Sequence, residues 1–291
     1  MEAPIMMFDR FVRFAVERAK LHTSLSPVPA LDKFRNLKSK DEKTVIGTVS
    51  YQAPKIRLLR GLSIDAVGSG GIHVLDLAVF SKPEFDLPIF CANCFTTPRI
   101  SIVVLDLNPL YNTVEQRDYK DKYYNHLLPL SQKYSKLLPW GQEITSESIQ
   151  FFSPVVIWTK YASNASQHEV LYSAFVDYFE AWMKMMDEAN EEKDPAKILR
   201  NRNAQHLYLT WRAQKDPGAQ ILKKSLVGEH TAEDVVRNFL FYGVDCMRQD
   251  KTFLDYFPEY QLEDGSVSKK RSIAGKSFKT RPWDQNGNFI A

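Results

Sequence analysis

Strand-like alternation of apolar and polar residues dominates the chain between residues 44 and 108. Five segments there are rich in β-branched and aromatic side chains and are separated by short links: 44–52, 55–67, 72–80, 87–95 and 99–107. Links this short join antiparallel neighbours. A sixth strand is expected over 154–161. The pattern therefore predicts an antiparallel sheet.

Elsewhere the apolar period changes to three or four residues, which indicates helices. These are expected near the amino terminus and over about 114–138, 171–186, 195–214 and 231–247. Several strands are apolar on both sides, so helices should cover both faces of the sheet. We predict one domain over residues 1–291, of class α+β. Its expected form is a three-layer α/β/α sandwich, with a central antiparallel sheet flanked by helices on both faces.

Composition argues against two classes of partner. No apolar run in the 291 residues reaches the length that spans a bilayer, and the net charge of +3 is small for a nucleic-acid reader. The first residues include acids and follow a helical period, so they are typical of a mature helix and not of a targeting peptide. We expect no membrane or nucleic-acid partner, and a monomer.

Cysteine and histidine spacing does not favour a metal or redox centre. The pair in "CANC", Cys91 and Cys94, lies in a predicted strand, where residues three apart point to opposite faces. Cys246 is far away in the sequence, and no two histidines are four residues apart. The "GSGG" stretch at 68–71 is interpreted as a hairpin turn because no helix follows it. No metal ligands and no bound cofactor are predicted.

An aspartate continues an apolar row in "IVVLDLNPL" (102–110). On a strand, Asp106 shares its face with Ile102 and Val104. A carboxylate there either finds hydrogen-bond donors or keeps its proton through a raised pKa, which suits a proton donor. The alternative is a strand-end residue that caps the turn beginning at Asn108.

Two more aspartates have apolar neighbours. Asp76 continues a row in "IHVLDLAVF", and Asp245 follows Phe241 by four residues in a predicted helix. If these two acids and Asp106 converge on one cavity, like charge and desolvation favour the protonated form of at least one.

Longer stretches carry a family resemblance. They are "YQAPKIRLLR", "DLPIFCANCF", "IVVLDLNPL", "SPVVIWTKY", "YLTWRAQKDPG" and "TFLDYFPEYQLEDGSVSKKRSIAGKSFKTRPWD". Together they resemble the ferredoxin-dependent bilin reductases, and the likeness extends from Phe8 to Phe289. The resemblance implies an α/β/α sandwich without bound metal, flavin or nicotinamide. It also implies biliverdin IXα as substrate, held between the sheet and the carboxy-terminal helices, and a plastid location with the transit peptide absent from this chain.

In this family, reduced plastid ferredoxin supplies electrons singly, and the protein protonates a bilin radical. By resemblance, Asp106 falls on the sheet aspartate beneath the tetrapyrrole and Asp245 on a helix aspartate of members that reduce the A-ring side, so both are predicted to be catalytic. Asp76 and Leu62 occupy positions where the phycocyanobilin-forming branch has a histidine and a glutamate. The resemblance therefore implies a two-electron reduction of the A-ring diene system of biliverdin IXα to phytochromobilin.

Other residues are candidates for substrate binding, together with Asp76. Lys160 and Arg212 lie in family segments associated with the bilin propionates, and cations are the expected partners of buried carboxylates. A solvated cation is the alternative for each. Asn93 could donate to a pyrrole carbonyl or make a structural hydrogen bond.

The tail is locally basic. Between residues 266 and 283 it contains no acid and six cations: Lys269, Lys270, Arg271, Lys276, Lys279 and Arg281. Such a patch would steer an acidic ferredoxin into a transient complex. The alternative is a solvated tail.

Two rival functions remain open at this point. A reductase of the same family could make phycoerythrobilin from dihydrobiliverdin, since both reactions use A-ring chemistry. A non-catalytic bilin carrier could keep the pocket without the reaction.

Overall fold

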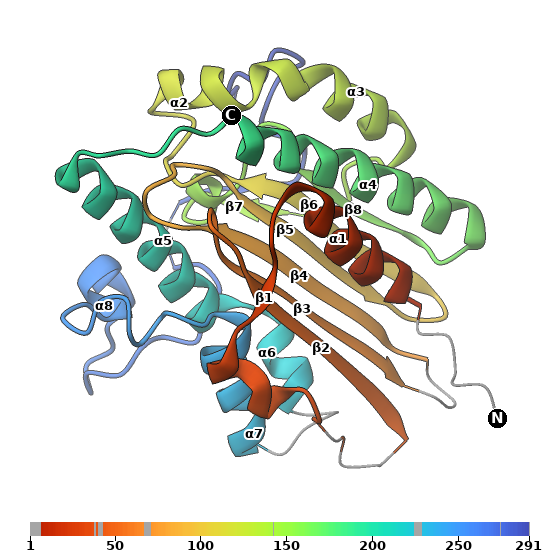
Figure 1. The fold of residues 1–291 in the computed structure, drawn as a ribbon, viewed down its shortest axis with the longest axis horizontal. Helices are drawn as coiled ribbons and strands as arrows, with labels where there is room; N and C mark the ends of the chain where they lie inside the picture. The colour runs from red at the N-terminus through yellow and green to blue at the C-terminus, as the bar shows by residue number, and fades with distance from the viewer. Residues whose placement is uncertain are drawn as a thin grey trace.

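A seven-stranded antiparallel sheet forms the centre of the molecule (Figure 1). The computed structural model describes residues 7–37, 39, 43–66, 71–141, 143–223, 229–273 and 275–290. The strand order is β1-β2-β3-β4-β5-β6-β8. The strands are β1 Ser26–Pro27, β2 Thr44–Gln52, β3 Ile56–Ala66, β4 His73–Ser81, β5 Ile89–Thr96, β6 Ile100–Asn108 and β8 Ile157–Ala162. The predicted sheet is confirmed, and "CANC" lies in β5 as expected. Most of "GSGG" lies outside the described residues.

Helices cover both faces, so the predicted α/β/α sandwich is also confirmed (Figure 1). One side holds α1 Asp9–His22, α2 Arg117–Tyr123, α3 Leu128–Leu137 and α4 Ala165–Glu188. The other side holds α5 Pro195–Lys215, α6 Gly218–Ile221, α7 Glu229–Val235 and α8 Phe253–Tyr256. No helix in the described part of the chain is long and apolar enough to cross a membrane.

Short elements connect these layers. A two-stranded sheet joins β7 Ile144–Thr145 to β9 Ser277–Phe278, so the tail returns to the segment before β8. The 3₁₀ helices are η1 Pro29–Phe34, η2 Asn125–Leu127, η3 Ile149–Phe151 and η6 Pro258–Tyr260.

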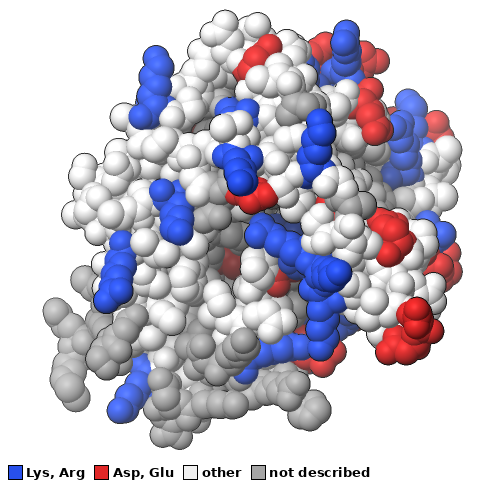
Figure 2. Space-filling model, turned by 180° about the vertical axis from the view of Figure 1, so that it is seen from behind, with Lys and Arg blue, Asp and Glu red and all other residues white. Residues whose placement is uncertain are grey.

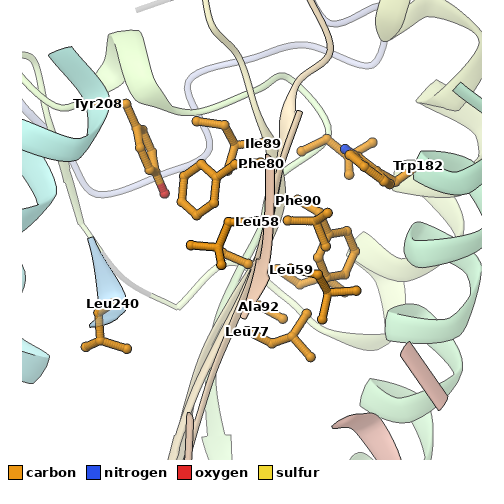
Figure 3. Close-up of a cluster of buried hydrophobic side chains, with 14 of the residues drawn as sticks. Leu58, Leu59, Leu77, Phe80, Ile89, Phe90, Ala92, Trp182, Tyr208 and Leu240 are labelled. Atoms are coloured by element: carbon orange, nitrogen blue, oxygen red, sulfur yellow. The ribbon is translucent and has the colours of Figure 1, made fainter. Parts of the chain in front are cut away.

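The core lies on both sides of the sheet because strand residues alternate faces. In Figure 3, Phe90 and Leu77 lie on the side of the sheet that faces Trp182 of α4, whereas Phe80 lies on the side that faces Tyr208 of α5. Trp182 is fully buried, and its indole Nε1 donates to the Pro88 carbonyl at 2.8 Å. Each such apolar side chain contributes about 1.5–3 kcal/mol by leaving water. Side chains fill the space between the sheet and α4, and the face of the sheet toward α5 carries the cavity described below.

One predicted helix is too long. After α7, a π-helical turn covers Val236–Leu240, and the residues from 241 onward form turns. Gly243 has φ +112°, a backbone conformation that side chains other than glycine rarely adopt. The helical path therefore stops before Asp245, and the expected helix over 231–247 is wrong in its last turns.

Candidate functional site

A cavity of about 390 Å³ lies between the sheet and the carboxy-terminal segments. This volume is within the range of small-molecule sites, ~300–1,000 Å³. Its walls come from four strands of the large sheet, β7, the end of α5, α6, the loop around η3 and the tail. The lining residues are Val74, Leu75, Asp76, Asn93, Cys94, Phe95, Ile102, Val104, Asn108, Thr145, Ser148, Phe151, Phe152, Trp158, Tyr208, Trp211, Arg212, Lys215, Asp216, Pro217, Gly218, Ile221 and Arg271.

One row of strand residues crosses the floor of the cavity. Asp76 of β4 is in register with Asn93 of β5, Asn93 with Val104 of β6, and Val104 with Trp158 of β8. Residues in register share a face, so these side chains all point toward α5. The sheet therefore fixes the distance between the carboxylate and its neighbours.

Asp76 is held by a buried arginine. Its side chain is 11% exposed and forms an ion pair with Arg60 of β3, whose side chain is 2% exposed. Arg60 also donates to the Asp76 carbonyl at 2.8 Å and to the Leu240 carbonyl at 2.9 Å. A buried charge without a partner is strongly unfavourable, so each member of this pair stabilises the other.

Asn93 links this pair to a second one. With its amide nitrogen toward Asp76, Asn93 donates to the two carboxylate oxygens at 2.8 and 3.2 Å, and its oxygen accepts from Arg212 Nη2 at 2.8 Å. Arg212 Nε donates to Asp216 Oδ2 at 3.0 Å, and Nη1 donates to the Tyr208 hydroxyl at 3.2 Å. Two carboxylates and two arginines thus form one connected network.

Asp216 was not among the residues selected from the sequence. It is the residue after α5, where Pro217 prevents the helix from continuing, and its side chain is 8% exposed. Its carboxylate also accepts from the Gly218 amide at 2.7 Å. The signal for it was the four-residue spacing from Arg212 at a helix end, which favours an ion pair.

Asp106 lies in the expected apolar row but does not line the cavity. It is fully buried and accepts hydrogen bonds from Leu107 N (2.8 Å), Asn108 Nδ2 (2.9 Å), Ser153 N (3.0 Å) and Ser153 Oγ. Burial raises the pKa of Asp106 to about 6, although the bonds from Ser153 and Leu107 act in the opposite direction. The two alternatives from the sequence, a residue with donors and a residue with a raised pKa, therefore both apply.

Asp245 is not where the sequence analysis expected it. It lies in a turn and not on a helix, its side chain is 53% exposed, and it forms an ion pair with Arg237. It is absent from the cavity wall. Asp76, Asp106 and Asp245 do not meet in one cavity, so the condition under which like charge would keep one of them protonated is not fulfilled.

The two cations predicted to bind the bilin propionates lie in different places. Lys160 is exposed and does not line the cavity. Arg212 does, but its guanidinium is already bonded to Asp216, Asn93 and Tyr208.

Two other cations line the cavity and were not selected from the sequence for it. Lys215 Nζ donates to the Ser268 and Lys270 carbonyls at 2.7 and 2.8 Å and lies 3.7 Å from the Tyr260 ring centroid. Burial lowers the pKa of Lys215 to about 8. Arg271 is exposed, and its side chain makes no hydrogen bond to another described residue.

Within the described residues, no three His, Cys, Asp or Glu side chains are grouped so as to hold a metal ion. Seen from behind, the molecule has a central recess with acidic side chains inside it and lysine and arginine side chains around it (Figure 2).

The family model for ferredoxin-dependent bilin reductases matches residues 13–242. The chain belongs to this family. This bilin reductase is 48% identical to chloroplastic phytochromobilin:ferredoxin oxidoreductase of Arabidopsis thaliana, with 97% of this chain and 84% of the relative covered. It is 28% identical to phycoerythrobilin:ferredoxin oxidoreductase of Nostoc punctiforme, with 81% and 93% covered.

A solved structure is similar throughout. The crystal structure of tomato phytochromobilin synthase in complex with biliverdin matches this bilin reductase with a TM-score of 0.94 and 55% identity, covering 98% of this chain and all of the other. The likeness includes the sandwich, which agrees with the fold described above.

The titration of Asp106 can be observed directly. A group with a pKa of about 6 is protonated below that pH, so the protein should show an infrared carbonyl band of a buried carboxylic acid that disappears as the pH rises through about 6. The Asp106→Asn variant should lack the band. A band that is absent throughout, or unchanged in the variant, would contradict this assignment.

Proposed function

We propose that this bilin reductase catalyses the ferredoxin-dependent two-electron reduction of the A-ring diene system of biliverdin IXα to phytochromobilin. The observation that carries the proposal is the cavity, whose apolar walls enclose two arginine-paired carboxylates, in a chain 55% identical to a phytochromobilin synthase that was solved with biliverdin. A tetrapyrrole needs apolar walls for its rings and polar groups at a few defined atoms.

The reaction consumes two electrons and two protons. Ferredoxin delivers the electrons one at a time to the conjugated system of the bilin, and carboxyl groups deliver the protons. Asp76 and Asp216 are the acids that line the cavity in the described part of the chain, so we propose them, in place of Asp106 and Asp245, as the groups that each take up a proton from water and pass it to the reduced bilin.

The arginines have a defined part in this scheme. A carboxyl group that gives up its proton becomes an anion, and a fixed cation beside it stabilises that charge without reorganisation. Arg60 is in this position for Asp76, and Arg212 for Asp216. The bilin propionates then need other cations, and Arg271 and Lys215 are our candidates because both line the cavity.

The expected product is inferred from two positions at which the chain differs from the phycocyanobilin-forming branch of the family. Asp76 and Leu62 stand where the phycocyanobilin-forming branch has a histidine and a glutamate, so reduction of the D-ring vinyl group is not expected. The chloroplastic relative from Arabidopsis supports a plastid location. We further propose that the protein acts as a single-domain monomer.

The direct test is anaerobic turnover of biliverdin with reduced ferredoxin, followed by chromatography of the products. We expect phytochromobilin from biliverdin and no product from dihydrobiliverdin. Phycoerythrobilin from dihydrobiliverdin would identify the rival reductase. Binding of biliverdin without any ferredoxin-driven change in absorbance would identify a carrier.

Asparagine variants test the acids. Asp76→Asn and Asp216→Asn keep the side-chain size but cannot donate the proton, so each should lower kcat by about 10²-fold or more while the Kd for biliverdin changes little.

The matched control for these variants is Asp245→Asn, which alters an exposed ion pair and should keep kcat within about twofold. An equal loss in the control variant would restore the sequence-based assignment of Asp245. Full turnover by Asp216→Asn would remove Asp216 from the scheme.

The basic tail is the proposed docking site for ferredoxin. Lys269, Lys270 and Arg271 are exposed, and Arg271 also lines the cavity, so an acidic partner bound there lies near the substrate. The double change Lys269→Glu, Lys270→Glu should lower kcat/KM for ferredoxin about tenfold at low salt, and the loss should shrink as salt rises.

The control reverses two exposed lysines on the opposite side of the sheet, Lys20→Glu and Lys136→Glu, which give the same change in net charge. Equal losses in both double variants would point to net charge alone and contradict docking at the tail.

A further inference from the structure

Asp106 is connected to the cavity although it does not reach it. Its neighbour Asn108 donates through Nδ2 to Asp106 Oδ2 at 2.9 Å and to the Phe151 carbonyl at 2.8 Å. The Asn108 oxygen accepts from the Tyr208 hydroxyl at 3.0 Å, and that hydroxyl accepts from Arg212 Nη1 at 3.2 Å. A continuous chain of hydrogen bonds therefore runs from Asp106 to Arg212.

We infer that Asp106 is a positioning residue that acts on the reaction through Asn108 and Tyr208, by fixing the guanidinium of Arg212 between Asn93 and Asp216. The inference rests on the proposed function, in which Asp216 and Asp76 serve the substrate. It assigns Asp106 a role that needs no contact with the bilin.

The direction of each bond supports this role. Both groups that face the nitrogen of Asn108 are acceptors, a carboxylate oxygen and a carbonyl oxygen, so the amide has one allowed orientation. Its oxygen then faces Tyr208, whose hydrogen must point toward Asn108. The lone pairs of the hydroxyl are left for Arg212, which can only donate.

Burial fixes the direction of these hydrogen bonds. Asp106, Asn108 and Tyr208 are 0%, 1% and 3% exposed, so their polar groups depend on one another for hydrogen bonds. An unsatisfied buried polar group costs about 1–3 kcal/mol, which is enough to favour one orientation strongly. Asp106 sets the direction of the hydrogen bonds in this chain, because its carboxylate only accepts and accepts four of them.

The Asp106→Asn substitution should disrupt this hydrogen-bond chain in a specific way. The asparagine side chain has one acceptor oxygen where the carboxylate had two. Its amide nitrogen is a donor and therefore faces a second donor, from either Ser153 or Asn108. Rotation of Asn108 relieves that conflict but presents its nitrogen to Tyr208. The Tyr208 hydrogen then points toward Arg212, and two donors face each other. Arg212 must move away from the position in which it contacts Asn93 and Asp216.

A double-mutant cycle tests the inference. Asp106→Asn breaks the chain at its origin, and Tyr208→Phe removes the hydroxyl near its end. If both act through Arg212, each should lower kcat for biliverdin about tenfold with KM within about twofold, and the double variant should lose no more than about tenfold. The absorption band of bound biliverdin should shift in the same way in all three variants, because Asp216 has moved in each.

Several results would overturn the inference. A loss of about a hundredfold in the double variant would mean independent roles. Normal kcat in Asp106→Asn, or a large loss there combined with normal kcat in Tyr208→Phe, would mean that Asp106 does not act through this chain. If Asp106→Asn does not fold, Asn108→Leu replaces it in the same cycle, because it cuts the chain at its middle.

The double-mutant cycle can be interpreted whichever bilin the protein makes. A wild-type protein that makes a different bilin would refute the proposed function, and the cycle would then be read on that reaction. A wild-type protein without turnover would also refute the proposed function, and the inference would be judged on the absorption band of bound biliverdin alone.

Discussion

Two arginines, Arg60 buried and Arg212 partly buried, allow two carboxylates to lie against an apolar cavity. A carboxylate desolvated alone costs several kcal/mol, and a paired one far less. Arg60 comes from a central strand and Arg212 from α5, with Asn93 between the two pairs. The site therefore exists only when α5 is docked on the sheet. Its acids, their separation and their charge all depend on that contact.

The two faces of the sheet have different tasks. The face toward α4 is filled by large side chains such as Phe90 and Trp182, which makes the strands a rigid support. The face toward α5 combines apolar residues with the polar row that begins at Asp76. Strand alternation lets one short sequence serve both purposes, since neighbouring residues belong to opposite faces. Geometry at the site is thus fixed by packing on the far side of the sheet.

The fold could be predicted well because the period of apolar residues decides strand or helix directly. The same alternation placed Asp76 and Asp106 each in an apolar row of its own strand. Pairing across strands did not follow from it, so the exact alignment of Asp76 with Asn93 had to come from the structure. Family likeness across almost the whole chain was also visible in the sequence.

The errors at the site have local causes. Asp245 was misplaced because a helix was continued past Leu240, where it ends, into the turns around Gly243. Lys160 was assigned to the cavity although β8 is an edge strand and the side chain is exposed. Asp216 was overlooked because its polar surroundings, "QKDPG", look like an ordinary loop. Its importance depends on Arg212 turning inward, which the four-residue spacing allows but does not require.

The tail completes the cavity from a distance in the chain. Lys215 binds the carbonyls of Ser268 and Lys270, and β9 pairs with β7, so the last wall is added after the sheet and α5. Arg271 of this tail lines the cavity, so a chain cut before residue 266 would keep the sheet and α5 but would lose Arg271 and both carbonyl acceptors of Lys215.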